Sequence, residues 1–488
     1  MDDSGDSPDA ASTAPLDPDT ERRIESFVGD WLTDATVPGA SLAVVVDDAV
    51  VYRGGFGARD LETNAPATPQ TLYGVASCTK SVAGLAVLLL AERGALSVSD
   101  PVTDYLDGPS LSGADGPLTI HDLLTHASGV PSLGSSLVLL SRLTGIDEAG
   151  VPLGDREDFY RHLDGAQDEV AGPPPGDAGT GDGPPADGDP GGADRFMYCN
   201  EGYNLVGHVV EAVDGRPFDQ FVADEILDPL GMERSTFDPA VTETADADAM
   251  TPYAVRDGDP EPTPFPHRPV SYAAGGLIAP VDELTRYLRL HAGGGSVDGV
   301  DLLPADALAR AHEGHVERAR GAYGYGWNRT DFLGRTLLGH SGSLGVSSAY
   351  LGFTADGAYG VAIGANTTPS PAPPAVGRGV LAILDGEDPA DVVPHFARAA
   401  RFAELTGEYE SYRGIVSGAV ERHGGALRLT LSHGLGEETA LLLPTDPERP
   451  DTTFAVPTMA GTRKTATFEP HEDHVDLFFD RYRLHRQS

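Results

Sequence analysis

The sequence predicts an α/β (α+β) protein in which a mixed domain is followed by a smaller, separate β domain. Near the start, two β-rich runs, Ala40 to Val46 and Ala49 to Arg53, flank Asp47-Asp48 as in a hairpin. Helical patterns fill the middle of the chain, and glycine-bounded, strand-like runs return between residues 324 and 366. After about residue 400, only short β-like runs separated by turns remain, which predicts a small antiparallel barrel or sandwich.

Individual elements follow from apolar spacing and from start signals. An amphipathic helix begins at Thr20, and Thr119 with Asp122 forms a capping box that opens a short helix from Ile120 to His126. Further helices are expected at 202–213, 218–227, 279–291 and 376–384. Strands are expected at 336–338, 347–352, 360–364, 427–431, 439–443, 466–468 and 475–479.

Two low-complexity stretches separate these elements. Residues 1–19 are acidic and rich in small residues, and we expect a disordered tail there. Residues 165–194 are almost entirely Gly, Pro, Asp and Ala, which predicts a flexible acidic insertion. The predicted domains are therefore residues 20–390 and residues 400–488.

Composition restricts the partners. The 488 residues include 75 acidic and 33 basic ones, for a net charge of −42. Nucleic acids and anionic membranes need a positive protein face, so neither is an expected partner. Acid excess with almost no lysine resembles adaptation to a salt-rich, halophilic cytosol. The N-terminus does not resemble a signal peptide and the longest apolar run is short, so a cytoplasmic location is expected.

The most informative stretch is Ser77-Cys78-Thr79-Lys80, which opens an apolar helix extending to Arg93. Residues at i and i+3 share a helix face, so the Lys80 amine is expected beside the Ser77 hydroxyl. A nearby amine can take the hydroxyl proton, and a helix N-terminus favours developing negative charge. Lys80 is one of only two lysines in the chain. The alternative is that Ser77 caps the helix and that Lys80 is a solvated charge.

Two later stretches complete a possible constellation. Tyr198-Cys199-Asn200 precedes the helix at 202–213, in a loop whose side chains can enter a cleft. His340-Ser341-Gly342-Ser343 lies in the strand-rich region, where Gly342 lets a ligand approach the backbone closely. Taken singly, Tyr198 could be a core aromatic residue, Asn200 a helix cap and His340 a polar residue in a turn.

Taken in order, these motifs resemble the S-x-x-K, Y-x-N and K/H-T/S-G pattern of one family. It comprises serine β-lactamases of the class C type, penicillin-binding DD-peptidases, and related family VIII-type esterases and D-aminopeptidases. Flanking stretches agree, among them Leu123 to Gly129 and Tyr325-Gly326-Trp327, and the resemblance extends from about Ile24 to Asp385. It implies a transpeptidase-like fold, in which a mostly antiparallel sheet from both chain ends encloses a helical subdomain. The active site is then expected at their junction.

The resemblance also implies roles for the catalytic groups. Ser77 attacks a carbonyl and becomes acylated, while Lys80 and Tyr198 share the proton transfers, either being a possible base. Asn200 hydrogen-bonds Lys80 or the substrate amide. The backbone amides of Ser77 and Ser343 form an oxyanion hole, in which one donor is typically worth about 3–4 kcal/mol.

The remaining motif residues are expected to bind substrate. His340 faces the substrate's carboxylate or polar end, with Ser341 lining the pocket beside Gly342. Class C lactamases have lysine at the position of His340, and a histidine is charged only part of the time near neutral pH. This difference favours an esterase or peptidase over a true β-lactamase. The alternative from another class is a non-catalytic, penicillin-binding-like scaffold or binding protein.

The C-terminal domain resembles the lipocalin-like β domains appended to some members of the family. In those proteins such domains mediate association or shield the active site. The resemblance therefore predicts a possible homo-oligomer through residues 400–488, acting on a small-molecule, ester or short-peptide substrate.

Other candidate motifs are weaker. Gly339 to Ser343 nearly matches the nucleophile elbow of α/β-hydrolases, with Ser341 as nucleophile, but its last glycine is missing and β-like sequence follows. His471-Glu472-Asp473-His474 lacks a third spaced ligand on a helix, so no zinc site is expected. No metal or organic cofactor is implied. Cys78 and Cys199 form no disulfide framework, and we expect small buried thiols that could approach each other.

Overall fold

The structure is a computed structural model that describes residues 16–108, 112–113, 116–135, 137–138, 154–170, 196–244, 247–266, 271–446 and 452–486. The chain forms two compact units, which divide between Leu381 and Ala382. Most of the predicted tail and insertion, residues 1–15 and 171–194, lies outside the described residues. The first helix begins at Pro18, inside the stretch assigned to the tail.

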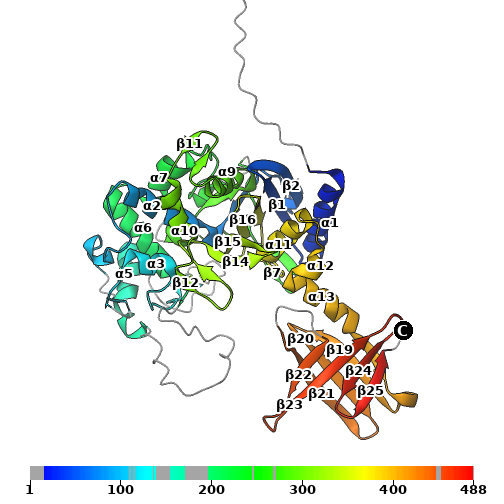
Figure 1. Ribbon diagram of the computed structural model, residues 1–488. Helices are drawn as coiled ribbons and strands as arrows, with labels where there is room; N and C mark the ends of the chain where they lie inside the picture. Colours follow the sequence, from blue (N-terminus) through cyan, green and yellow to red (C-terminus); the bar gives the residue numbers. More distant parts are fainter. Residues whose placement is uncertain are drawn as a thin grey trace, which may run out of the picture. The chain divides into compact units, whose positions relative to one another are not determined.

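The first unit is organised around a nine-stranded antiparallel sheet (Figure 1). Its strand order is β12-β13-β14-β15-β16-β17-β1-β2-β3. The strands are β1 (Gly39–Val46), β2 (Ala49–Asp60), β3 (Ala65–Pro66), β12 (Val316–Glu317), β13 (Ala322–Tyr323), β14 (Asn328–Phe332), β15 (Arg335–Ser343), β16 (Ser348–Thr354) and β17 (Tyr359–Ala365). Because β1 pairs with β17, the early hairpin and the late strands form one sheet. This confirms the predicted mixed α/β fold with an antiparallel sheet built from both ends of the unit.

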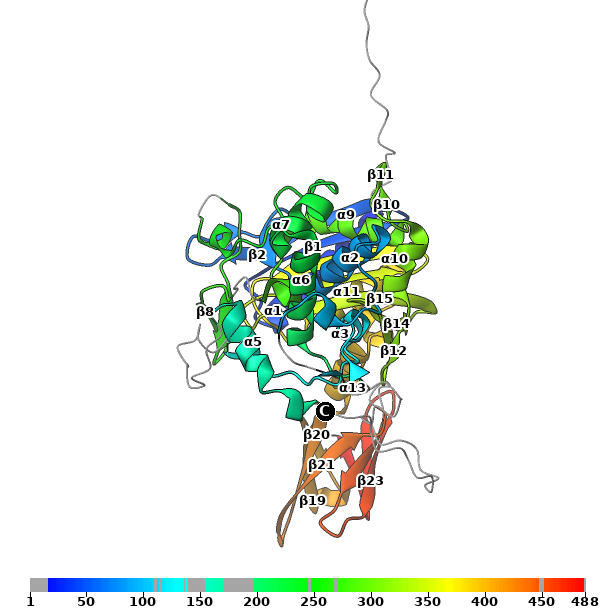
Figure 2. The ribbon, with the colours of Figure 1, turned by 90° about the vertical axis from the view of Figure 1, so that its left-hand side faces the viewer.

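Helices cover the sheet and form a subdomain beside it. Among the described residues, the helices of this unit are α1 (Pro18–Asp34), α2 (Thr79–Glu92), α3 (Ile120–Thr125), α5 (Arg156–Asp164), α6 (Asn200–Asp214), α7 (Phe218–Val222), α8 (Tyr272–Gly275), α9 (Val281–Ala292), α10 (Ala305–His312) and α11 (Pro373–Leu384). Helix α9 packs on β1, β16 and β17, whereas α2 packs against α6, α8 and α10. Figure 2 shows α2 and α6 side by side. The capping box of Thr119 and Asp122 is present at α3, as predicted.

Small pairs of strands connect these elements. They are β4 (Leu72–Gly74) with β9 (Ile278–Pro280), β5 (Ser112–Gly113) with β6 (Gly116–Pro117), β7 (Tyr253–Arg256) with β8 (Asp259–Pro262), and β10 (Ser296–Val297) with β11 (Val300–Asp301). The pair β4–β9 matters most for the site, because β4 leads directly into the turn that carries Ser77.

The second unit is a closed, antiparallel eight-stranded barrel, which confirms the predicted C-terminal β-barrel. Its elements are α12 (Pro389–Val392), α13 (Pro394–Leu405), β18 (Gly407–Glu410), β19 (Val416–His423), β20 (Ala426–His433), β21 (Gly436–Pro444), β22 (Thr453–Pro457), β23 (Arg463–Pro470), β24 (Val475–Phe479) and β25 (Tyr482–Arg486). Pairing of β18 with β25 closes it. Alternate inward residues, such as Leu427, Leu429 and Leu431, form its core. Helix α13 was not predicted.

Among the described residues, no helix is long and apolar enough to cross a membrane.

Candidate active site

Ser77 lies in a tight turn between strand β4 and helix α2. The 3₁₀ helix η1 (Ala76–Cys78) carries it, and Ala76 has a left-handed backbone with φ of +50°. Between Thr71 and Leu90, Ser77 is the single residue that is not fully buried. The left-handed conformation of Ala76 costs free energy, because alanine has a Cβ atom. It occurs at the turn that exposes the Ser77 hydroxyl from an otherwise buried segment.

Strand β15 passes directly over this turn at Gly342. A Cβ atom on Gly342 would lie 2.1 Å from the Val75 carbonyl oxygen and 2.9 Å from the Ser77 backbone nitrogen. Only glycine allows the two backbones to come this close. The predicted juxtaposition of Ser77 with the His340–Ser343 stretch is therefore present, with Ser343 as the next residue of β15.

Lys80 lies one turn after Ser77 and is fully buried. Its Nζ is 3.0 Å from Ser77 Oγ, 2.7 Å from Asn200 Oδ1 and 2.7 Å from the backbone oxygen of Ala274. The Ala274 carbonyl, and Asn200 in the orientation given, can only accept hydrogen bonds. A neutral amine that donates to both directs its lone pair at the Ser77 hydroxyl. This is the arrangement that removal of the hydroxyl proton requires.

Burial sets the protonation of Lys80. Desolvation lowers its pKa to about 7, although Cys199 and Glu201 oppose this shift. Near neutral pH the amine is therefore divided between its charged and neutral forms.

Tyr198 and Asn200 come from the segment that enters helix α6. Asn200 is the first residue of that helix, and its side chain bonds Lys80, as predicted. The ring centroid of Tyr198 lies 4.9 Å from Lys80 Nζ. Tyr198 is 36% exposed, but desolvation of its hydroxyl group raises its pKa above the usual value, while the Ser77 hydroxyl partly opposes this shift. Tyr198 is therefore a protonated, neutral phenol at neutral pH.

His340 is buried and both ring nitrogens are engaged. Its Nδ1 is 2.7 Å from the Ser341 carbonyl oxygen, so Nδ1–H donates and Nε2 accepts from the Tyr323 hydroxyl at 3.0 Å. Desolvation lowers the pKa of His340 to about 3, with the Lys80 charge as a second cause. In this arrangement His340 is neutral and offers no polar atom to a ligand, which does not support its predicted role at the substrate's polar end.

A pocket of about 490 Å³ lies along the other face of β15. Ser341 and Gly339 line it, and Ser341 is exposed while Gly342 is buried. Because successive residues of a strand face opposite sides, Ser341 faces the pocket as Gly342 faces Ser77. Ser341 therefore lines a pocket, but on the face of β15 opposite Ser77, whereas the prediction placed it in the Ser77 pocket. The structure also argues against Ser341 as the nucleophile of an α/β-hydrolase elbow, because Ser341 lies within a strand that pairs with β16.

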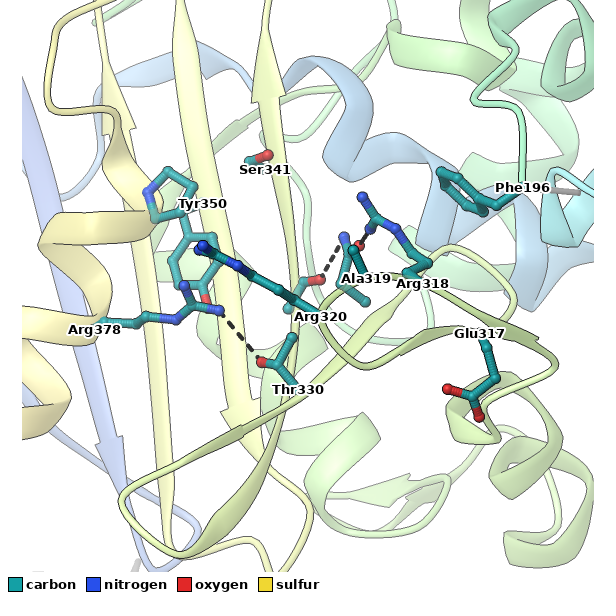
Figure 3. Close-up of a pocket in the computed structure, with 12 residues that line it drawn as sticks. Phe196, Glu317, Arg318, Ala319, Arg320, Thr330, Ser341, Tyr350 and Arg378 are labelled. Atoms are coloured by element: carbon teal, nitrogen blue, oxygen red, sulfur yellow. Dashed lines mark hydrogen bonds between the residues drawn. The ribbon is translucent and has the colours of Figure 1, made fainter. Parts of the chain in front are cut away.

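Three arginines line the same pocket and were missed from the sequence (Figure 3). Arg318 lies 4.4 Å over the ring of Phe196 and contacts Asn328. Arg378, from α11, bonds Thr330 at 3.3 Å, and its Nε is buried without a partner. Arg320 lines the same pocket, and Figure 3 shows Glu317 directed away from Arg320 and Arg378. The pocket is thus cationic in a chain of net charge −42.

His126 is a further residue that its motif did not single out. It is buried among aromatic rings, including Tyr198 at 4.3 Å between centroids, and its Nδ1 accepts from the Cys199 amide at 3.1 Å. Its Nε2 has no partner. The backbone N–H of Cys199 thereby fixes the ring against Tyr198. The only sequence signal was its place in the stretch from Leu123 to Gly129.

Both cysteines are free and buried, as expected. The Cys78 thiol donates to the His340 carbonyl at 3.2 Å, and burial raises its pKa to about 12. Neither thiol is therefore an activated nucleophile.

Comparison with known protein families agrees with this fold. The chain belongs to the Beta-lactamase family, whose model matches residues 21–385. A second model, the Pab87 octamerisation domain, matches residues 389–485. Members of the superfamily are serine hydrolases, among them β-lactamases and DD-peptidases.

Individual relatives extend this picture. An octameric penicillin-binding protein homologue from Pyrococcus abyssi is 30% identical with a TM-score of 0.82, over 96% of this chain and 100% of that one. Penicillin-binding protein 4 of Amycolatopsis lactamdurans is 27% identical over 341 residues, 65% of this chain and 78% of that protein. Protein flp of Staphylococcus aureus is 28% identical over 221 residues, 45% of this chain. That match spans only 39% of the length of flp.

Proposed function

We propose that this protein is a serine hydrolase that cleaves ester or amide bonds of small, peptide-like substrates through an acyl-enzyme on Ser77. The observation that carries the proposal is the environment of Lys80. Its amine is buried, has a pKa near 7, and is held by two acceptors so that its lone pair points at Ser77 Oγ.

The steps follow from these positions. Ser77 Oγ attacks the substrate carbonyl while its proton passes to Lys80 Nζ. The backbone amides of Ser77 and Ser343 stabilise the oxyanion. Tyr198, a neutral phenol at this pH, passes the proton from Lys80 to the leaving group and does not act as an anionic base. Water then attacks the acyl-enzyme. Lys80 takes the proton of this water and returns it to Ser77 Oγ as the acyl–oxygen bond breaks.

The cationic pocket supports a substrate with a carboxylate at its far end, away from the scissile bond, because Ser77 does not line the pocket. Planar guanidinium groups suit carboxylates, and Arg318, Arg320 and Arg378 converge on the face of β15 that presents Ser341. The role that the sequence analysis gave to His340 therefore passes to these arginines. A peptidase that requires a free C-terminal carboxylate is the activity that this arrangement favours, ahead of an esterase.

Intact-mass spectrometry in high salt tests the nucleophile. We expect a fluorophosphonate to add once per chain at Ser77, and the Ser77→Ala and Lys80→Ala variants to remain unmodified. A penicillin tested in parallel separates the activities: a lasting adduct indicates a penicillin-binding protein, and rapid turnover a β-lactamase. If well-folded protein reacts with neither reagent, the proposal is wrong and a non-catalytic scaffold is left.

A matched pair of substrates tests the pocket. The same acyl-dipeptide is offered with a free C-terminal carboxylate and as its C-terminal amide. Loss of one charge-assisted hydrogen bond in Arg378→Gln should reduce the preference for the acid about tenfold. Arg335→Gln is the control, because Arg335 pairs with Asp356 and does not line the pocket. Equal preference in both variants would contradict the carboxylate role.

For the barrel, we propose homo-oligomerisation, by analogy with the octameric homologue from Pyrococcus abyssi. Light scattering should give a mass near eight chains for the full protein, and a monomer for a chain that ends at Asp388. A truncated chain that keeps the full oligomeric state would contradict the assignment.

A further inference from the structure

A cluster of histidines surrounds one buried carboxylate in the barrel. Asp476 of β24 has a fully buried side chain. The Nε2 atoms of His471 and His474 lie 3.5 Å and 3.7 Å from its oxygens, and His485 Nδ1 contacts Oδ1. His485 comes from the neighbouring strand, where it pairs in register with Asp476. The third ligand could not be predicted from the sequence. Asp476 and His485 lie on two paired strands that follow the His471–His474 turn, and only the fold brings them to it.

We propose that His471, His474, His485 and Asp476 form a binding site for a divalent transition-metal ion of the Zn²⁺ type. Three imidazole nitrogens and one carboxylate oxygen are ligands that such ions prefer. The ligand atoms of His471, His474 and Asp476 lie within 4.8 Å of one another. Tetrahedral ligands at about 2.0–2.2 Å from zinc stand roughly 3.3 Å apart, so the atoms of these three residues must close by at most about 1.5 Å.

The side chains that must move are free to do so. His471 and His474 are 43% and 35% exposed and occupy the turn between β23 and β24, whereas Asp476 is fixed in the barrel wall. Their rings already stack with centroids 4.5 Å apart. A small rotation of two surface side chains therefore brings both rings onto Asp476, with no change in the strands.

An outer residue orients one ligand. His474 Nδ1 donates to Asp473 Oδ1 at 2.6 Å, which leaves Nε2, on the Asp476 side of the ring, as the nitrogen that can bind a metal ion. A carboxylate that holds the far nitrogen of a metal-ligating histidine is a common second partner in zinc sites.

Arg483 competes for the same carboxylate. Its Nε and Nη2 lie 3.1 Å and 2.6 Å from Asp476 Oδ2. It leaves Oδ1 to the two histidines His474 and His485, so the metal uses Oδ1 while Arg483 keeps Oδ2. Bound in this way, the ion ties the β23–β24 turn to β25.

The test uses the full-length protein, stripped with a chelator and then dialysed against Zn²⁺ or Co²⁺ in high salt. We expect one bound ion per chain by elemental analysis, the visible absorption of tetrahedral Co²⁺, and a higher Tm for the metal-loaded protein. The His471→Asn/His474→Asn double variant should lose that ion, the Co²⁺ spectrum and the Tm shift. His423→Asn, which changes an exposed barrel histidine outside the cluster, should lose none of them.

Two further variants separate a metal site from a network of ion pairs. Asp473→Asn should weaken Zn²⁺ binding about 10- to 100-fold, as expected for an outer partner of a ligand. Arg483→Gln removes the competing cation and should tighten binding, whereas a plain ion-pair network would only lose stability. Equal metal content in the double variant and the parent, or no retained ion in the parent, would overturn the proposal.

Discussion

Lys80 shows how uncharged neighbours can make a lysine into a base. The carbonyl of Ala274 and the amide oxygen of Asn200 satisfy two N–H groups of Lys80 without adding charge. Desolvation can then hold the pKa of the amine near 7. A carboxylate at either position would favour the ammonium form of Lys80, and the amine could then no longer act as a base near neutral pH.

The first prediction concerns that neutrality. Because Lys80 must be unprotonated, kcat/KM should rise with pH through about 7 and be lost below it. Asn200→Asp places a carboxylate 2.7 Å from Nζ, which should raise the lysine pKa and move this acid limb upward by about 1–3 pH units. The measurement is a pH profile of kcat/KM for the parent and the variant.

Asn200→Ala serves as the control for that profile. It removes the hydrogen bond without adding charge, so activity should fall while the acid limb stays near its original pH. An acid limb that is unmoved in Asn200→Asp would mean that Lys80 is not the group that titrates in catalysis.

Among the elements, β15 and η1 contribute most to the site through their close contact. The second prediction is that Gly342→Ala separates them, because its Cβ would meet the Val75 oxygen at 2.1 Å. Overpacking of this kind should cost about 1–3 kcal/mol of unfolding free energy. Loss of the Ser77 geometry should reduce kcat/KM by about 100-fold or more, as a displacement of about 1 Å can do.

Urea denaturation and steady-state kinetics check both effects. The matched control is Gly29→Ala in helix α1, where a Cβ meets nothing within 4 Å. That variant should keep its activity and gain roughly 0.5–1 kcal/mol of stability. A Gly342→Ala protein with normal kcat/KM would show that the contact is not needed for the chemistry.

The same elements show what could be predicted. Spacing alone placed Lys80 beside Ser77, and helix capping placed α3, because both depend on neighbours within one turn. The Ala274 carbonyl could not be predicted, since a backbone oxygen has no residue signature. Arg318 and Arg378 converge from a strand connection and a helix 60 residues apart, and only the tertiary fold brings them together. The Tyr323 hydroxyl that bonds His340 likewise comes from another strand.

The barrel shows the same limit at a larger size. Alternating apolar residues predicted antiparallel strands, but closure depends on the pairing of β18 with β25. That pairing joins the two ends of the domain, at Tyr409 and Arg486, and no local pattern encodes it. Helix α13 begins between the two predicted domains, in a stretch where no element was expected.

For the whole molecule, the dominant property is the net charge of −42. Mutual repulsion of this size opposes the compact state, and isolated surface ion pairs contribute little against it. The Debye length falls from about 10 Å at 0.1 M salt to about 3 Å at 1 M, so salt should remove most of the repulsion. The third prediction is therefore that the free energy of unfolding rises steeply with KCl up to about 1 M and changes less beyond it.

Urea denaturation at a series of KCl concentrations measures this dependence. Sucrose at matched water activity is the control, because it strengthens burial by exclusion from the surface without screening charge. If screening dominates, KCl should stabilise the protein far more than sucrose does, and most of the gain should come below 1 M. A gain that continues linearly to several molar KCl, and that sucrose reproduces, would instead attribute the effect to burial of apolar surface. The acidic composition would then act on solubility rather than on folding.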